Sequence, residues 1–160
     1  MDPSADLIIR TAEAADARIL ADFNLLMAQE TEHRELDPGT LLAGVSNLIR
    51  HPSRGFYLVA ETTHHPDQQI VGSLLITTEW SDWRNGLFWW IQSVFVRNDW
   101  RRRGVYRRLY QQVQQLAAEQ DSVEICGFRL YVERDNGVAQ QTYRQLGMDK
   151  TPYRIYETLR

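Results

Sequence analysis

The chain has 160 residues, of which 43% are hydrophobic, 24% charged and 11% aromatic, and we expect one globular domain spanning residues 1–160. Its formal net charge of −3 argues against nonspecific nucleic-acid binding, because phosphate contacts need a positive surface. Cys126 is the only cysteine, which excludes an internal disulfide and a cysteine-cluster metal site.

The N-terminal residues resemble no signal peptide, since residues 1–4 carry neither a basic region nor an apolar stretch. No apolar run approaches the roughly 20 residues that a membrane span needs. We therefore expect a cytoplasmic protein without a membrane partner.

The N-terminal part of the chain predicts one strand and two helices. Residues 7–10 are a short apolar segment, and Thr11 is a candidate N-cap for the helix that follows. Asp37 and Pro38 predict the N-cap and first turn of a second helix. The predicted buried stripe of the first helix consists of Ile19, Phe23, Leu26 and Met27, and that of the second of Leu41, Leu42, Val45, Leu48 and Ile49.

The middle of the chain predicts three antiparallel strands. Two β-rich runs, residues 56–61 and 70–78, are joined by a polar turn at residues 64–67. A second polar turn leads into residues 87–96, a long aromatic and aliphatic run that is typical of a central strand.

The C-terminal part predicts helix, strand, helix, strand. A helix begins at Val105 and continues to about Ala118, and a strand follows at residues 128–132. Asn136 begins another helix and Gly147 ends it. Alternating apolar residues at 153–159 predict a last strand. The order β α α β β β α β α β indicates a mixed α/β (α+β) domain.

The loop at residues 98–104 carries the clearest chemical signal. A central strand ends there and a helix begins, so unpaired backbone N–H groups and the helix dipole favour an anion. Arg101, Arg102 and Arg103 add positive charge, and Gly104 allows close approach of the backbone. A pyrophosphate is therefore a plausible ligand; the alternative for a bare arginine run is a solvated surface cluster.

Two motifs resemble those of the GNAT superfamily of N-acetyltransferases. Arg101 and Gly104 match the acetyl-CoA signature, Arg or Gln, two residues, Gly, one residue, Gly or Ala, although Tyr106 replaces the last small residue. The second motif is an Asn-x-x-Ala-x-x-x-Tyr-x-x-x-Gly-hydrophobic pattern, reproduced by Asn136, Ala139, Tyr143, Gly147 and Met148.

The resemblance implies a central, mostly antiparallel, splayed sheet flanked by about four helices, with acetyl-CoA as co-substrate. Strands 87–96 and 128–132 would separate and admit the pantetheine arm, which would pair with backbone groups of Val94 and Val96. The residues implied in acetyl-CoA binding are Val94, Phe95, Val96, Arg101, Arg102, Arg103, Gly104, Val105, Tyr106, Asn136 and Tyr143.

The resemblance also implies that Tyr143 is the general acid toward the departing thiolate; the alternative is that its ring only packs the helix on the sheet. Gln92 occupies the position where some relatives carry a glutamate base. The first candidate to accept the proton of the amine, through water, is Glu79, with Asp82 and Glu30 behind it. A solvated carboxylate at the end of a strand is an equally good interpretation of Glu79.

Several tryptophans surround the turn between the second and third strands of the middle segment. They predict either an aromatic wall for the acceptor or, as is more common, a core or dimer interface. The candidate acceptor-binding residues are Trp80, Asp82, Trp83 and Gln92. His64 and His65 have no third ligand in view, so we expect no metal.

The resulting hypothesis is an N-acetyltransferase that acts on a small amine, a polyamine or a protein amino group. The alternative is a non-catalytic acyl-CoA-binding module of the same fold. No nucleic-acid partner is expected, and the tryptophans and the predicted last strand suggest a possible homodimer.

Overall fold

A single mixed sheet forms the centre of the computed structural model, which describes residues 6–63 and 69–160. In these residues the sheet has five strands in the order β1-β2-β3-β4-β5. The first four strands pair antiparallel, and β5 pairs parallel to β4. The strands are β1 (Leu7–Thr11), β2 (Phe56–Thr62), β3 (Ile70–Ser81), β4 (Gly86–Val96) and β5 (Ile125–Arg129).

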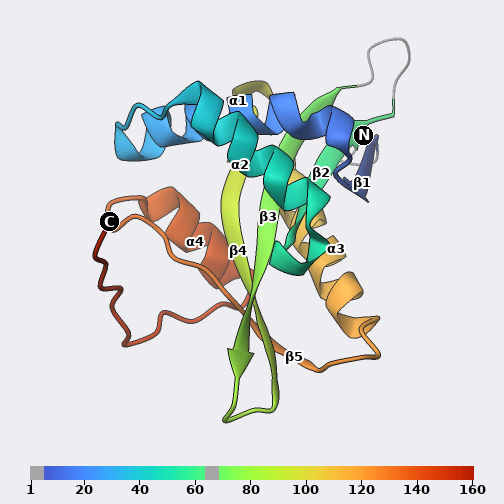
Figure 1. Ribbon diagram of the computed structural model, residues 1–160, viewed down its shortest axis with the longest axis vertical. Helices are drawn as coiled ribbons and strands as arrows, with labels where there is room; N and C mark the ends of the chain where they lie inside the picture. The colour runs from blue at the N-terminus through green and yellow to red at the C-terminus, as the bar shows by residue number, and fades with distance from the viewer. Residues whose placement is uncertain (1–5, 64–68) are drawn as a thin grey trace.

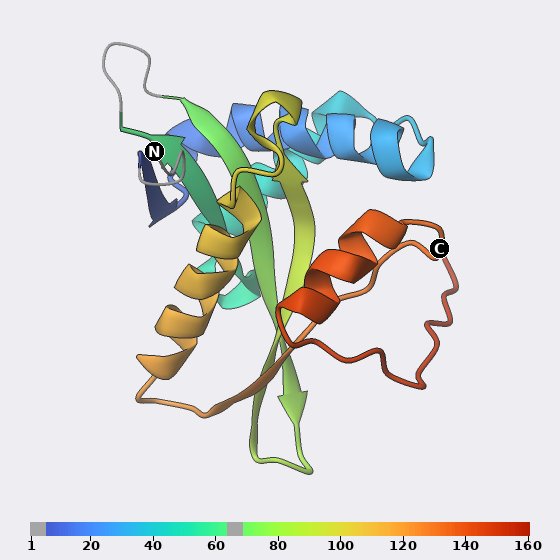
Figure 2. The same ribbon diagram turned by 180° about the vertical axis from the view of Figure 1, so that it is seen from behind.

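Helices lie on both faces of the sheet (Figures 1 and 2). α1 and α2 cover one face, and α3 covers the other. The helices are α1 (Ala17–Glu32), α2 (Pro38–Arg50), α3 (Val105–Ala118) and α4 (Gly137–Gln145). This arrangement confirms the predicted α/β fold with a mostly antiparallel sheet. The predicted turn at residues 64–67 and the N-terminal residues 1–4 lie outside the described residues.

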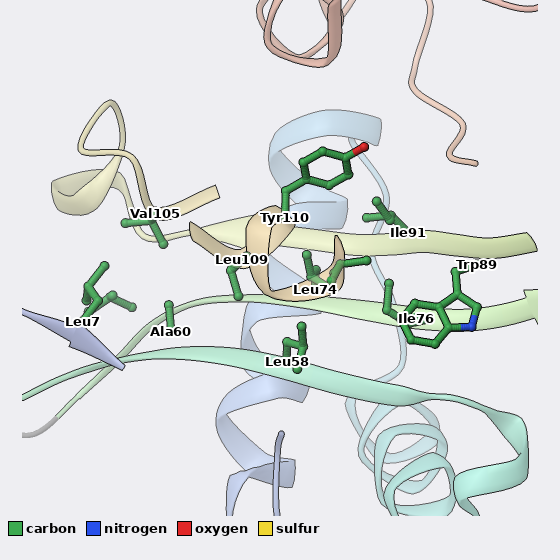
Figure 3. Packing of buried hydrophobic residues seen from close by; sticks show 12 residues of the cluster. Leu7, Leu58, Ala60, Leu74, Ile76, Trp89, Ile91, Val105, Leu109 and Tyr110 are labelled. Atoms are coloured by element: carbon green, nitrogen blue, oxygen red, sulfur yellow. The ribbon is translucent and has the colours of Figure 1, made fainter. Parts of the chain in front are cut away.

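Two apolar clusters hold the helices on the sheet, because successive side chains of a strand point to opposite faces. On the α3 face, Leu58, Leu74 and Ile76 pack against Leu109 (Figure 3). On the other face, Leu20 of α1 and Val45 of α2 pack on Tyr57, Val59 and Leu75. Both faces of the central strands are therefore buried.

The predicted start of α1 was wrong. β1 extends to Thr11, and the N-cap of α1 is Asp16, after a short 3-10 turn. Asp16 is buried and binds the Arg10 guanidinium at 2.7 Å, so the turn is tied to β1. The buried face of the helix also differs from the prediction: Leu26 is 45% exposed, whereas Leu20 and the alanines at positions 17, 21 and 28 are buried. The start of α2 is confirmed, since Asp37 accepts a hydrogen bond from the Thr40 amide at 2.7 Å.

Both predictions of C-terminal strands were also wrong, one in its boundaries and the other in its existence. β5 begins at Ile125 and ends at Arg129, because it pairs with the first part of β4 and then turns away. Residues 153–159 form no strand, and the Tyr156 side chain is 91% exposed. The tail runs clear of the sheet in both views (Figures 1 and 2), so its alternating pattern has no strand to pair with.

Candidate active site

The sheet opens between β4 and β5. Their parallel pairing runs from Leu87 opposite Ile125 to Trp90 opposite Arg129. β4 then continues to Val96, whereas β5 has ended. No strand of the described residues pairs with this part of β4 on the β5 side. Apart from the Val96 carbonyl, which accepts from Arg101, its backbone N–H and C=O groups on that edge are therefore available to a ligand that carries amides.

A bulge lies in β4 beside this opening. The pairing of β3 with β4 shifts register, since Ser73 lies opposite Phe95 but Leu75 lies opposite Gln92. Ser93 has φ of 48°, in the left-handed region. A bulge of this kind redirects the backbone of one strand, and it lies next to the two valines expected to pair with the ligand. The ring of Phe95 packs on Phe23 of α1, with centroids 4.6 Å apart, so the Phe95 side chain points to α1 and not into the opening.

The basic loop leads from β4 into α3 with two left-handed residues, Arg102 with φ of 59° and Gly104 with φ of 77°. Gly104 is the N-cap of α3, and no side chain in the described part of the chain caps the helix. The helical hydrogen-bond ladder starts with the Arg108 amide, which donates to the Gly104 carbonyl at 3.0 Å. Alternating φ signs gather successive N–H groups into an anion-binding concavity, and the helix dipole favours the same charge.

The three arginines of the loop are not equivalent. Arg101 donates to the Val96 carbonyl at 2.9 Å and forms an ion pair with Glu30 of α1, so its guanidinium ties α1 to the end of β4. Arg102 and Arg103 are exposed and form no ion pair within the described residues; Arg103 lies over the Trp100 ring. Arg102 and Arg103 are therefore the arginines of this loop available to an anion.

The second motif forms α4 and places Tyr143 against α3. Asn136 caps the helix, because its side-chain oxygen accepts from the Ala139 amide at 3.1 Å. Gly147, with φ of 83°, ends it. The Tyr143 and Tyr106 rings meet edge to face, with centroids 5.7 Å apart. Two motifs that are distant in the sequence thus meet beside the loop. Burial raises the pKa of Tyr143 above its ordinary value, so its hydroxyl stays protonated at neutral pH.

Glu79 belongs to a polar cluster on the sheet. Its carboxylate accepts from the Trp90 indole N–H at 2.7 Å and from the Arg129 guanidinium at 2.7 Å. Arg129 in turn lies over the Phe88 ring, 3.6 Å from its centroid. The cluster joins β3, β4 and β5 at the point where β4 and β5 separate.

The structure does not bring the hairpin-tip residues to the opening. Trp80 and Trp83 are exposed, and Asp82 accepts from the Trp83 amide within the turn. β4 begins at Gly86, next to the tip. With a rise of about 3.3 Å per residue, Gly86 lies about 23 Å along the strand from Ser93. Gln92 is different, because it is half-buried beside the bulge.

The family model described as "Acetyltransferase (GNAT) family" matches residues 20–148. The chain belongs to the GNAT acetyltransferase family. Members of this family use acetyl-CoA as co-substrate, so the match supports acetyl transfer in general. No curated protein sequence matches the chain.

Solved structures agree with this membership. A possible acetyltransferase from Clostridium difficile 630 is 38% identical, with a TM-score of 0.85, and the match covers 96% of this chain and 97% of that one. A ribosomal-protein-alanine N-acetyltransferase from Brucella melitensis is 16% identical with a TM-score of 0.71 over 96% and 98% of the two chains. An aminoglycoside acetyltransferase from an uncultured soil sample is 18% identical with a TM-score of 0.73 over 98% of both. The last two show the fold alone.

This GNAT domain also has a buried polar group that the sequence analysis missed. Asn24 of α1 donates to the Tyr57 hydroxyl at 3.3 Å, and both side chains are buried. Burial raises the pKa of Tyr57, and hydrogen bonds with Asn24 and with Ser93 at the bulge partly oppose that rise. The sequence signals were an asparagine on a buried helix face and a serine inside an apolar strand. The hydrogen-bonded pair of Asn24 and Tyr57 lies on the face of the sheet that α1 covers, beside the bulge.

Within residues 6–63 and 69–160, no three His, Cys, Asp or Glu side chains gather in a way that could hold a metal ion. In the same part of the GNAT chain, no helix is long and apolar enough to cross a membrane.

Proposed function

We propose that this GNAT protein transfers the acetyl group of acetyl-CoA to a primary amine by direct attack, with Tyr143 as general acid. One observation carries the proposal: the uncapped start of α3, Tyr143 and the open edge of β4 converge at one place. An anion-binding turn, an amide-binding edge and a protonated phenol are the groups that an acyl-CoA thioester needs.

The residues fit acetyl-CoA in distinct ways. Backbone groups of Val94 and Val96 on the open edge would pair with the amides of the arm, while N–H groups of residues 102–106 and the Arg102 and Arg103 side chains would hold the phosphates. Val105 is buried in the core and offers only its backbone. Asn136 acts through its cap, which fixes the start of α4 and hence the position of Tyr143. Bound acetyl-CoA supplies an activated thioester.

The reaction requires two proton transfers: one from the amine and one to the sulfur of the leaving group. An amine with a pKa near ~10.4 must lose its proton before it attacks, at a cost of roughly 4 to 5 kcal/mol at neutral pH. When the new C–N bond forms and the C–S bond breaks, the Tyr143 hydroxyl donates its proton to the sulfur. A positioned acid typically contributes about 10²–10⁴-fold.

We propose Glu79 as the acceptor of the amine proton, through water. Its carboxylate accepts from the Trp90 indole N–H and from Arg129, which hold it at the point where β4 and β5 separate. Glu30 lies on α1 and ties that helix to the end of β4 through Arg101, and Asp82 lies at the hairpin tip, so neither is at the point where β4 and β5 separate. Gln92, beside the bulge, would orient the acceptor.

Glu79→Gln is expected to lower turnover about tenfold at pH 7, and the deficit should shrink as the pH approaches the pKa of the amine near ~10.4. The reason is that a neutral amine no longer needs a base. Initial rates from pH 6.5 to 10 measure this, with Glu119→Gln at the end of α3 as a surface-carboxylate control. A deficit that is the same at every pH would show that Glu79 acts only through its ion pair.

The acceptor is proposed by class only: a small amine, a polyamine or a protein amino group. The alanine N-acetyltransferase and the aminoglycoside acetyltransferase among the structural neighbours act, by their names, on amino groups or on amine-bearing sugars. The hairpin tip is too far from the bulge to line the acceptor site of its own chain, so Asp82 and Trp83 are not included in it. Trp80 directly follows Glu79 in β3, so its side chain points to the opposite face of the sheet and is not included either.

The direct test combines acetyl-CoA with a panel of amines of these three classes, and measures both released thiol and acetylated amine by mass spectrometry. Equal amounts of the two products are expected for at least one acceptor. Binding of acetyl-CoA without transfer to any amine would favour the non-catalytic acyl-CoA-binding module instead. Gln92, in place of the glutamate of some relatives, is the observation that favours that second function.

We also propose a cytoplasmic homodimer that does not bind nucleic acid. The tail carries four exposed apolar side chains, Tyr153, Ile155, Tyr156 and Leu159, and such surfaces mark interaction sites. Light scattering at micromolar concentration is expected to show a dimer that Ile155→Asp converts to a monomer. A wild-type monomer would contradict this part of the proposal.

A further inference from the structure

The Tyr106 hydroxyl is a buried polar atom without a partner. Among the described residues it is the only buried side-chain oxygen or nitrogen that makes no hydrogen bond. Buried polar groups are nearly always paired, because burial removes their hydrogen bonds to water. An unpaired one in a native protein needs an explanation, and a partner that arrives with a ligand is one.

The place of Tyr106 in the fold points to the same explanation. Tyr106 stands in the first turn of α3, directly after the basic loop, and its ring lies between two other tyrosines. It meets Tyr143 edge to face and stacks on Tyr110 at 6.3 Å. Tyr106 also packs against the core cluster on the α3 face. Val94 of β4 and Leu130, which follows β5, pack against the same cluster from the two sides of the opening between these strands. The Tyr106 side chain is therefore packed between the start of α3 and Tyr143 of α4.

The chemistry of the hydroxyl limits what it can bind. Burial raises the pKa of Tyr106 well above its usual range, and the neighbouring Tyr143 and Tyr110 raise it further. The group is a phenol at every physiological pH, and a protonated phenol without a partner can donate a hydrogen bond. A hydrogen-bond acceptor such as an amide carbonyl would satisfy this donor.

We propose that the Tyr106 hydroxyl binds the co-substrate, by donating a hydrogen bond to a carbonyl oxygen of the amide-bearing arm of acyl-CoA. This inference rests on the proposed function. It also assigns a role to the one departure from the signature, where a small residue is replaced by tyrosine. The large side chain is turned toward Tyr143 on α4, and it adds a donor beside the arm.

The test removes a single oxygen atom. Tyr106→Phe is expected to weaken the binding of acetyl-CoA and of CoA about fivefold, which is the effect of one ordinary hydrogen bond. Adenosine 3′,5′-bisphosphate, which lacks the arm, is expected to bind wild type and variant equally. The melting temperature of the ligand-free variant should be unchanged or higher, because the variant no longer buries an unpaired hydroxyl. Tyr110→Phe, in the same aromatic stack, is the matched control and should change none of the affinities.

Calorimetric titration of wild type, Tyr106→Phe and Tyr110→Phe with each of the three ligands separates the outcomes. If wild type binds acetyl-CoA and Tyr106→Phe binds it with the same affinity, the inference is overturned but the proposed function stands. If Tyr106→Phe weakens the binding of adenosine 3′,5′-bisphosphate as much as that of acetyl-CoA, the inference is overturned too, because the variant would then have disturbed the basic loop. No binding of acetyl-CoA to the wild type overturns both the inference and the proposed function.

Discussion

Replacing Gly104 by aspartate is expected to weaken acetyl-CoA binding at least 100-fold. Gly104 is the N-cap of α3, at the point where backbone N–H groups face the predicted pyrophosphate. A carboxylate there would oppose the phosphate charge by about 3 kcal/mol for unit charges about 5 Å apart at an effective dielectric constant near 20. Every 1.4 kcal/mol corresponds to roughly a tenfold change in affinity.

Gly104→Asn is the matched control for this substitution. The φ of 77° at position 104 strains most side chains, but asparagine and aspartate both tolerate the left-handed region. The two variants have nearly the same size and differ by one charge. Calorimetry with acetyl-CoA should therefore find the aspartate variant much weaker than the asparagine variant. Equal affinities would mean that the phosphates do not meet the start of α3.

Tyr143→Phe is expected to lower kcat about 10²-fold while changing the affinity for acetyl-CoA less than twofold. The substitution removes the proton donor but keeps the ring that packs on Tyr106. The expected loss is at the lower end of the range for a positioned general acid. Parallel measurement of kcat and of the dissociation constant separates loss of chemistry from loss of binding, and an unchanged kcat would remove Tyr143 from the mechanism.

The pH profile supplies a second readout for Tyr143. Burial raises the pKa of this phenol above its ordinary value of 10.0, so the acid stays protonated as the pH rises from 7 to 9. Over the same range the amine loses its proton, and the wild-type rate should rise. Tyr143→Phe should lower the whole curve without shifting this rise. Tyr110→Phe serves as the control for removal of a nearby tyrosine hydroxyl.

Both predictions depend on contacts between segments that are distant in the sequence. The loop after β4 and the helix α4 are each recognisable by local pattern, but only the fold shows that Tyr143 reaches α3 through Tyr106. The same holds for Arg101, whose sequence position suggests a phosphate ligand and whose side chain instead joins Val96 and Glu30. A basic side chain can pair with any anion within reach, and the sequence does not say which one is near.

The sequence by itself determined the order of helices and strands as far as α4, the start of α2 at Asp37, the strand-loop-helix turn at Gly104 and the family. These features depend on local chemistry: caps, apolar periodicity and glycine at left-handed positions act over a few residues. The tertiary structure alone decided where β5 ends, that the tail forms no strand, and that β4 has a bulge at Ser93. It alone placed Glu79 beside Arg129 and left the Tyr106 hydroxyl without a hydrogen-bond partner among the described residues. A strand needs a neighbour and a buried polar group needs a partner, and in a folded chain both come from segments far away in the sequence.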